Sequence, residues 1–280
     1  MSKLPTGYTE LEYIQSSGAQ YIDTGFKPNQ NSRITLRLAH TDTAASYLFS
    51  ASEANPLFGL CYVGGYYAEY GSMQKQFSAD LSTVTTIDVS NSFFVVGSQS
   101  FATAVADFTA PSNLFLCCGN NGGSSNLHAS LKLYSCQIYD NNTLVRNFVP
   151  CKNASGAIGL YDTVEGQFYA NAGTGTFTAG PEIIPDPPAA PTGLQTVLAV
   201  VLQWAASANA DGYDVYRDGA KLGSTEGTQY VDATPEANQT YVYTVKAVNG
   251  GGESAGTSIT VYTKSGYFEY KPLIESANFP

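Results

Sequence analysis

The most evident shortage in this 280-residue sequence is one of charged side chains. Asp, Glu, Lys and Arg together make up 13% of the residues, half of the usual ~25%. The net charge is −10, and no stretch of the chain concentrates Lys and Arg. Because nucleic acids and anionic membranes attract clustered basic residues, we expect neither nucleic-acid binding nor membrane insertion.

Cysteine is also scarce, and its pattern excludes the common cysteine-based sites. No two of the five cysteines have the Cys-x-x-Cys spacing of zinc and redox sites. An extracellular disulfide framework usually has an even number of widely spaced cysteines. We therefore interpret the cysteines as mostly buried thiols of a protein that folds in a reducing cytoplasm: Cys61, Cys117, Cys118, Cys136 and Cys151.

Long apolar runs are missing as well. No run approaches the ~20 residues that a transmembrane helix needs. The opening residues, MSKLPTGYTELEYIQ, lack the apolar segment of a signal peptide. We expect a protein that is made in a host cytoplasm and reaches a surface by another route, such as assembly into a particle released by lysis.

Catalytic signatures are sparse. His40 and His128 are the only histidines, and the sequence contains no GxSxG, HExxH or P-loop pattern. A glycosidase needs two carboxyl groups about 5–9.5 Å apart. Glu10 and Glu12 have same-face spacing on a strand, but they lie in an edge segment near the N-terminus. We expect a protein that is not an enzyme and that uses no cofactor and no metal ion.

In place of charge the chain carries 20 Tyr and 27 Gly, together with many Ser, Thr and Asn. This mixture favours strands and turns over helices. Ile34, Leu36 and Leu38 alternate with polar residues, which predicts a half-buried strand.

Further strand signals fill the first 180 residues. The continuous apolar runs 93–96 and 114–117 indicate strands buried on both faces. Asn141-Asn142 predicts a tight hairpin turn, because Asn tolerates a positive φ. No segment has a persuasive helical period, so residues 1–180 are predicted to form an all-β, two-sheet domain.

A proline-rich stretch then divides the chain. Residues 181–191 hold five prolines, which favours an extended polyproline II spacer of ~3.1 Å per residue. Residues 192–263 show strand signals at short, regular intervals. Roughly seven strands in about eighty residues is the size of an immunoglobulin-like sandwich. Residues 264–280 are interpreted as a separate tail.

The second region carries a recognisable pattern. Trp204 lies in its second predicted strand, and Tyr241 begins a strand whose apolar residues alternate up to Ala247. Together with residues 213–219 and 230–232, this pattern resembles a fibronectin type III domain. The resemblance implies that Tyr241 is the tyrosine-corner residue, whose hydroxyl bonds back to the preceding loop. Such domains are usually spacers, so we assign this one no ligand.

The first region carries another resemblance. It rests on the opening segments LPTGYTELEYIQSSG and QYIDTG and on residues 133–140, 144–150 and 159–169. These segments resemble the concanavalin A-like, laminin-G-like jelly rolls of tail and surface proteins from phages of gut Firmicutes. The resemblance implies that the first and last strands pair. It also implies glycan binding or particle decoration, and it carries over no catalytic residue.

Candidate binding residues follow from how proteins hold sugars. Aromatic rings pack on the apolar face of a pyranose, and polar side chains surround its hydroxyls. The candidates for a glycan site lie around the Gly64-Gly65 turn and in loop 118–126: Tyr62, Tyr66, Tyr67, Tyr70, Asn120 and Asn121. The alternatives are that the tyrosines line a packed sheet or a subunit contact, and that the loop is a plain flexible turn.

The tail is rich in aromatic residues, which predicts a docking strip for another virion subunit: Tyr267, Phe268, Tyr270 and Phe279. We expect a homo-oligomeric structural protein at the surface of a bacteriophage virion, as a tail fibre, baseplate or capsid appendage. Its lectin-like domain would attach to a host cell-surface glycan. A bacterial cell-surface carbohydrate-binding protein or adhesin is one alternative, and a jelly-roll glycoside hydrolase is the second.

Overall fold

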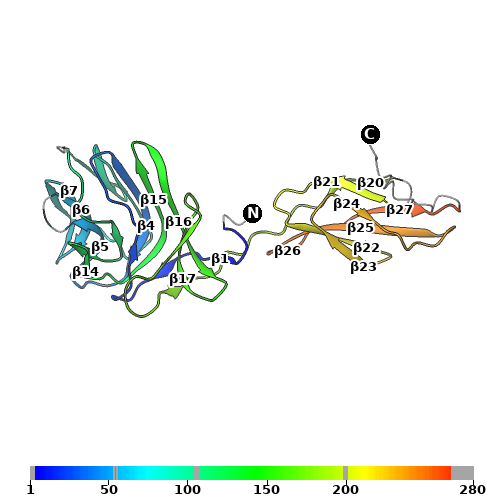
Figure 1. Cartoon of the computed structure of the whole chain (residues 1–280), viewed down its shortest axis with the longest axis horizontal. Coiled ribbons are helices and arrows are strands. Elements are labelled where there is room, and N and C mark those ends of the chain that lie inside the picture. The colour runs from blue at the N-terminus through cyan, green and yellow to red at the C-terminus, as the bar shows by residue number, and fades with distance from the viewer. Residues whose placement is uncertain (1–3, 53, 55, 104–106, 198–200, 266–280) are drawn as a thin grey trace, which may run out of the picture. The chain divides into compact units, whose positions relative to one another are not determined.

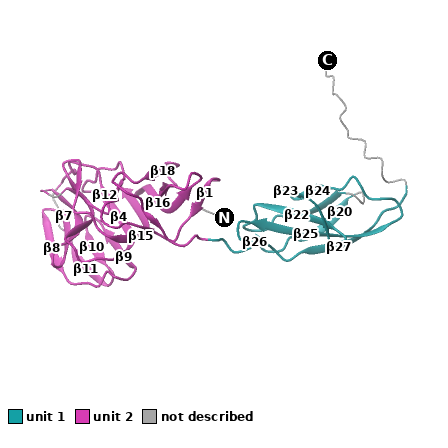
Figure 2. Ribbon diagram, turned by 90° about the horizontal axis from the view of Figure 1, so that it is seen from below, with its two compact units in different colours: residues 1, 184–280 teal, residues 2–183 magenta. Residues whose placement is uncertain are grey.

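The computed structural model describes residues 4–52, 54, 56–103, 107–197 and 201–265. All regular secondary structure within these residues consists of β-strands (Figure 1), so the predicted all-β class is confirmed. The chain divides into a first compact unit, residues 2–183, and a second, residues 184–280 (Figure 2). Among these described residues there is no helical segment that could span a membrane.

Two antiparallel sheets build the first unit. The larger sheet runs in spatial order through β11 (Gln99–Ala102), β10 (Phe93–Val96), β9 (Thr85–Val89), β4 (Ser32–His40), β15 (Leu131–Asp140), β16 (Thr143–Asn153), β17 (Ile158–Asp162) and β18 (Gln167–Ala170). Three short strands extend it: β1 (Tyr8–Glu10) pairs with β16, β2 (Ile14–Gln15) pairs with β15, and β19 (Thr178–Ala179) pairs with β2.

The smaller sheet faces the larger one. It runs through β3 (Ile22–Asp23), β12 (Phe115–Leu116), β5 (Ser46–Ser52), β6 (Leu57–Tyr62), β7 (Tyr66–Gly71) and β8 (Met73–Phe77). A separate hairpin, β13 (Gly119–Asn121) with β14 (Ser124–Asn126), packs beside β5.

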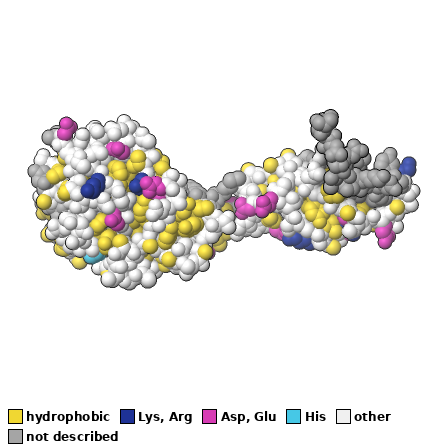
Figure 3. Space-filling model, viewed as in Figure 1, with side chains coloured by type: hydrophobic (Ala, Val, Ile, Leu, Met, Phe, Trp, Pro, Cys, Tyr) yellow, Lys and Arg dark blue, Asp and Glu magenta, His cyan; other side chains and the backbone are white. Residues whose placement is uncertain are grey.

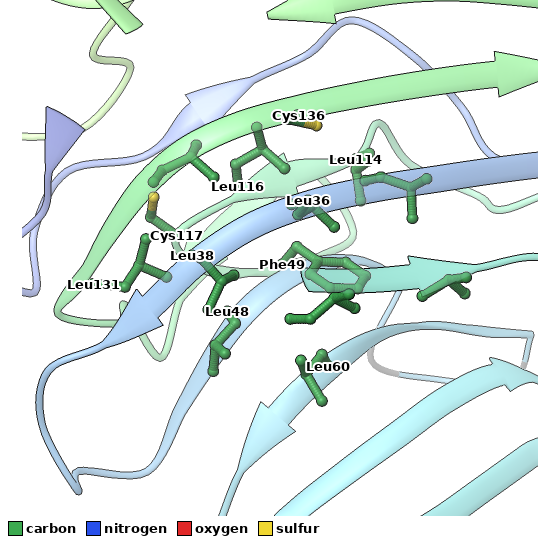
Figure 4. Close-up of a cluster of buried hydrophobic side chains, with 14 of the residues drawn as sticks. Leu36, Leu38, Leu48, Phe49, Leu60, Leu114, Leu116, Cys117, Leu131 and Cys136 are labelled. Carbon is green, nitrogen blue, oxygen red and sulfur yellow. The ribbon is translucent and has the colours of Figure 1, made fainter. Parts of the chain in front are cut away.

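The core lies between the two sheets, and β4 shows why the sequence forms it. Ile34, Leu36 and Leu38 are at most 1% exposed, whereas Arg33 and Arg37 on the other face are exposed. The predicted half-buried strand is therefore confirmed. Figure 4 shows Leu36 and Leu38 of β4 beside Phe49 of β5, inside one buried apolar cluster. Burying each such side chain stabilises the fold by about 1.5–3 kcal/mol.

The two continuous apolar runs behave differently. All four residues of 114–117 are buried, as predicted, because β12 lies inside the smaller sheet and the hairpin β13–β14 packs nearby. The prediction that 93–96 is buried on both faces is wrong. Phe94 and Val96 point into the core, but Phe93 and Val95 are half-buried, since β10 lies near the edge of the larger sheet and exposes its outer face.

Turns and terminal strands of the first unit follow the sequence. Asn141 and Asn142 have φ values of 48° and 62° and connect β15 to β16, which confirms the predicted hairpin. The implied pairing of first and last strands is confirmed by β1 against β16 and by β2 against β15 and β19.

All five cysteines are buried, as predicted, and none of them forms a disulfide within the described residues. Burial raises the pKa of the Cys117 and Cys151 thiols to about 12. Because the thiolate is the reactive form, these side chains are inert packing groups.

The second unit consists of two further sheets. One contains β20 (Thr192–Val197), β21 (Val201–Ala205) and β24 (Gln229–Val231). The other contains β23 (Ala220–Thr225), β22 (Gly212–Arg217), β25 (Thr240–Asn249), β26 (Gly252–Glu253) and β27 (Thr257–Tyr262). Trp204 and Tyr213 meet edge-to-face between the sheets, with ring centroids 5.3 Å apart. The three-stranded sheet packs against the five-stranded sheet, and the two together form an immunoglobulin-like sandwich.

Much of the predicted spacer, residues 181–191, is bonded to one unit or the other. On the side of the first unit, Glu12 N donates to Pro181 O and Ile183 N donates to Glu10 O, both at bonding distance (2.8 and 2.9 Å). On the side of the second unit, Asn249 Nδ2 donates to Asp186 O at 2.8 Å. Residues 181–183 of the proline-rich segment therefore belong to the first unit, and Asp186 is bonded to the second.

The tyrosine corner implied by the sequence is present in the second unit. The hydroxyl of Tyr241 accepts a hydrogen bond of 3.0 Å from Glu236 N, and its ring lies 4.9 Å from the Arg217 guanidinium carbon. We expect Tyr241→Phe to lower the free energy of unfolding of this unit by about 1 kcal/mol, the net value of one hydrogen bond. Fluorescence of Trp204, the single tryptophan, reports the transition in denaturant.

Tyr262→Phe is the matched control, because Tyr262 is 59% exposed and its hydroxyl has no hydrogen bond within the described residues. Equal unfolding midpoints for the two variants would contradict the role of the Tyr241 hydroxyl.

Candidate functional site

The predicted tyrosine cluster lies on the hairpin between β6 and β7. Gly64 turns the chain with a φ of 65°, in the left-handed region that glycine adopts without strain. Tyr62 pairs with Tyr66 across the hairpin, and their ring centroids are 4.9 Å apart in an edge-to-face contact. The expected turn at Gly64-Gly65 is therefore present, and the rings of Tyr62 and Tyr66 meet beside it.

Tyr66 anchors this hairpin to the larger sheet. Its ring stacks on Phe77 with centroids 5.7 Å apart, and its hydroxyl lies 2.9 Å from Nδ1 of His40. Burial, and next the nearby Tyr62, raise the pKa of Tyr66 to about 12. Burial lowers the pKa of His40, although Asp42 opposes the shift, so the imidazole is neutral at pH 7. Tyr66 is thus a fixed wall of the site, not a mobile contact.

Tyr70 is not a surface residue, and its assignment to a glycan site is wrong. Side chains alternate along β7, so Tyr66, Ala68 and Tyr70 face the core while Tyr67 faces outward. Tyr70 is 0% exposed, and its hydroxyl lies 3.3 Å from the Ser32 carbonyl oxygen. Tyr67 remains half-buried on the opposite face of the sheet, so the four tyrosines do not share one surface.

A shallow cavity of about 570 Å³ lies against the two hairpin tyrosines. Tyr62 and Tyr66 form one wall, and Gly64 and Gly65 form the rim. The end of β8 and the two residues after it close the cavity, namely Gln76, Phe77, Ser78 and Ala79. This arrangement offers apolar ring surface with an amide and hydroxyls beside it, which is the chemistry that holds a pyranose. The contributions of β8 were not predicted, because its sequence, MQKQF, has apolar residues only at its two ends and lacks the alternation that indicates a strand.

The predicted loop asparagines have different roles. Asn120 is 1% exposed and braces its loop, because Nδ2 donates to Asn113 O and Oδ1 accepts from Gly123 N, both at 2.7 Å. Asn121 is exposed. Asn120 lines a second cavity of about 310 Å³, together with Asp23 and Asn113.

The two predicted patches are far apart in strand order. Asp23 and Phe115, which line the cavity at Asn120, belong to β3 and β12, at one end of the smaller sheet, whereas the tyrosine cavity lies at β7 and β8, at the other end. The structure therefore does not combine the tyrosines and asparagines in one site. The predicted docking residues Tyr267, Phe268, Tyr270 and Phe279 lie outside the described residues.

Comparisons with known proteins give partial matches. No protein-family model matches the chain. Over 102 residues the chain is 41% identical to a poly(3-hydroxybutyrate) depolymerase of Ralstonia pickettii, covering 34% of this chain and 19% of that protein. It is 29% identical over 183 residues to an alpha-amylase of Niallia circulans, covering 50% and 14%. It is 37% identical over 107 residues to chitinase Chi52 of Paenibacillus xylanexedens, covering 35% and 20%.

The chain thus spans a fifth or less of the length of these curated relatives. Among solved structures, the chain is similar to "FN3tt mut", at 23% identity over 28% of this chain and 97% of that one, with a TM-score of 0.25. It is also similar to the tripod from the baseplate of bacteriophage Tuc2009, at 12% identity over 93% and 82%, with a TM-score of 0.18. Both TM-scores are too low to establish a shared overall fold.

Proposed function

We propose that this chain is a non-enzymatic structural protein of a bacteriophage virion, placed in a tail fibre, a baseplate or a capsid appendage. Its first unit is a concanavalin A-like domain that attaches the particle to glycans on the host surface. Its second unit is a fibronectin type III spacer. The particle surface is its location, and other virion subunits and a host glycan are its partners.

The aromatic cavity at Tyr62 and Tyr66 is the observation that carries the proposal. Its rings are fixed in place, Tyr66 by His40 and Phe77, so little conformational entropy is lost when a sugar packs against them. Gln76 and Ser78 stand beside the rings as hydrogen-bonding groups. Such a rigid aromatic wall with polar neighbours suits a neutral sugar ring.

Three further features support the proposal. The segments that resemble phage surface proteins pair with one another in the larger sheet, β1 with β16 and β2 with β15. Charged side chains are few and scattered on the face seen in Figure 3, which suits contact with an uncharged polysaccharide. Two of the partial relatives carry the names of polysaccharide hydrolases, an alpha-amylase and a chitinase.

Glycan binding is tested on an array of bacterial surface polysaccharides and neutral oligosaccharides probed with the full chain. We expect binding to at least one glycan, and we expect Tyr62→Ala to weaken it about tenfold, because a stacked ring and its buried area are lost. Tyr262→Ala removes an exposed tyrosine of the second unit and is the matched control.

Two outcomes would contradict the proposed attachment function: no glycan bound, or equal binding by Tyr62→Ala and the unsubstituted chain. Release of reducing sugar ends from a bound glycan would instead support the hydrolase alternative. Immunogold labelling of purified phage particles tests the virion location separately.

A further inference from the structure

A groove of about 420 Å³ crosses the outer face of the larger sheet of the first unit, away from the tyrosine cavity on the smaller sheet. Its walls come from the N-terminal segment and from strands β4, β15 and β16. The polar side chains that matter most are Glu10, Glu12, Arg37, Tyr134, Gln137 and Asn147.

A β-bulge in β15 places Tyr134 in this groove. In the pairing of β15 with β4, Leu133 lies opposite Leu38 and Ser135 opposite Arg37, so Tyr134 is the extra residue. Leu133 and Cys136 point into the core, whereas Tyr134 and Ser135 are both half-buried and both line the groove. Bulges re-aim side chains beside functional sites, and this one adds an aromatic ring to a groove that is also lined by polar side chains and by Val149, Pro150 and Ile183.

A neighbouring ring, that of Tyr13, packs against Tyr134. The Tyr134 ring centroid lies 5.2 Å from that of Tyr13, and the Lys132 ammonium lies 4.6 Å from the Tyr13 centroid. The Tyr13 ring thus packs against Tyr134, and Tyr134 lines the groove. A ring held in this way presents a fixed apolar surface to a ligand.

Within the described residues, the charged side chains that line the groove form no ion pairs. Arg33, on the same face of β4, donates two hydrogen bonds to Asp88, at 2.8 and 2.6 Å. Arg37 also lies on this face, yet its guanidinium forms no hydrogen bond or ion pair within the described part of the chain. The side-chain carboxylates of Glu10 and Glu12 likewise form no hydrogen bond or ion pair within the described residues, although they line the same groove as Arg37.

Amide groups complete the polar wall. Gln137 Nε2 donates to Asn147 Oδ1 at 3.1 Å, and the Tyr139 hydroxyl donates to Gln137 Oε1 at 3.1 Å. Asn147 Nδ2 in turn donates to Thr163 Oγ1 at 2.7 Å. Each amide nitrogen has a second hydrogen, so both amides are oriented in advance and still able to donate to a ligand.

We propose that this groove is a second oligosaccharide-binding site, in which Tyr134 packs on a pyranose face while Glu12, Arg37 and Gln137 bind its hydroxyls. Carboxylates accept from hydroxyls, and the guanidinium fork donates to them. A ligand with many charges of one sign would meet repulsion from either the two carboxylates or the arginine. A neutral, hydroxyl-rich sugar chain satisfies all of these groups.

The test uses amide nitrogen–proton NMR spectra of the full chain titrated with cellohexaose, maltohexaose and chitohexaose. These neutral hexasaccharides differ in linkage, curvature and acetamido content. At least one is expected to shift the amides of residues 35–37 and 134–137. Tyr134→Ala and Glu12→Gln should each weaken that binding about tenfold, the effect of 1.4 kcal/mol. Asp107→Asn, an exposed carboxylate outside the groove, and Tyr62→Ala should leave it unchanged.

The proposal is overturned if no hexasaccharide shifts these amides at millimolar concentration, or if Tyr134→Ala and Glu12→Gln both bind like the unsubstituted chain. Amide spectra of the unliganded variants check that the fold is kept, and Tyr134→Trp should restore binding because it restores an aromatic face. Arg37→Gln serves if Tyr134→Ala does not fold, because Arg37 is exposed. Since Tyr62 and Tyr134 lie in different cavities, their variants separate failure of this site from failure of the proposed attachment site.

Discussion

Replacing Asp232 by alanine is expected to destabilise the second unit by about 3 kcal/mol, the cost of removing one partner from a buried charged pair. Asp232 is 4% exposed, and Oδ2 accepts hydrogen bonds of 2.7 Å from both Arg217 Nη1 and the Tyr243 hydroxyl. Alanine would leave the hydroxyl of Tyr243, a residue that is 0% exposed, without its acceptor. The unfolding midpoint in denaturant, followed by Trp204 fluorescence, measures the loss.

Asp211→Ala is the matched control, because Asp211 is exposed and its carboxylate has no hydrogen bond or ion pair within the described residues. Its midpoint should stay within the ordinary scatter of surface substitutions, about 0.5 kcal/mol. Asp232→Asn keeps an acceptor and loses the charge, so its stability should fall between the two. A midpoint for Asp232→Ala equal to that of Asp211→Ala would contradict the buried pair.

The same carboxylate makes the second unit sensitive to acid. Burial by itself raises the pKa of Asp232, but hydrogen bonds from Thr234 and Tyr243 and the charge of Arg217 outweigh it, so the pKa is lowered. Its stabilising contribution is therefore fully present above the unfolded-state pKa of about 3.9. It is lost as the pH falls through the lower pKa of the folded state. Asp232→Asn should remove this part of the acid dependence.

Features that depend on a single strand or a single turn could be predicted from the sequence. Strand β4 could be predicted because its apolar residues alternate strictly and one face is buried. The hairpin at Asn141 and the bond of Tyr241 also depend on neighbours a few residues away. Short-range stereochemistry fixes such features, so they can be predicted from local sequence.

The candidate site was only partly predictable, because tyrosine suits both a core and a surface. Four tyrosines near one glycine turn indicated a single aromatic surface, but the pleat of β7 sends Tyr66 and Tyr70 inward and Tyr67 outward. The groove on the larger sheet was harder still. It combines Glu12, Arg37 and Tyr134, and only strand register and a bulge bring such distant segments together.

Replacing Tyr70 by alanine is expected to destabilise the first unit by about 3–5 kcal/mol, as large-to-small substitutions of buried aromatic residues do. The ring is packed between Phe58 and Phe108, with centroids 5.3 Å from each, and alanine would leave a cavity there. Calorimetry of the full chain measures the effect. Trp204 fluorescence identifies the thermal transition of the second unit, so the remaining calorimetric transition is assigned to the first unit. The burial of Tyr70 and the position of its hydroxyl near the Ser32 carbonyl oxygen both support a structural role for this residue.

Tyr67→Ala is the matched control. Tyr67 lies on the same strand, β7, but its side chain faces outward and not into the core. Its transition temperature should barely move, whereas that of Tyr70→Ala should drop clearly. Tyr70→Phe should lie near the unsubstituted chain, since it keeps the ring and loses only the long hydroxyl contacts of 3.3 and 3.4 Å to the carbonyl oxygens of Ser32 and Gln30. If Tyr70→Ala instead kept its transition temperature and lost glycan binding, the ring would have to be a ligand contact and the packing of β7 described above would be wrong.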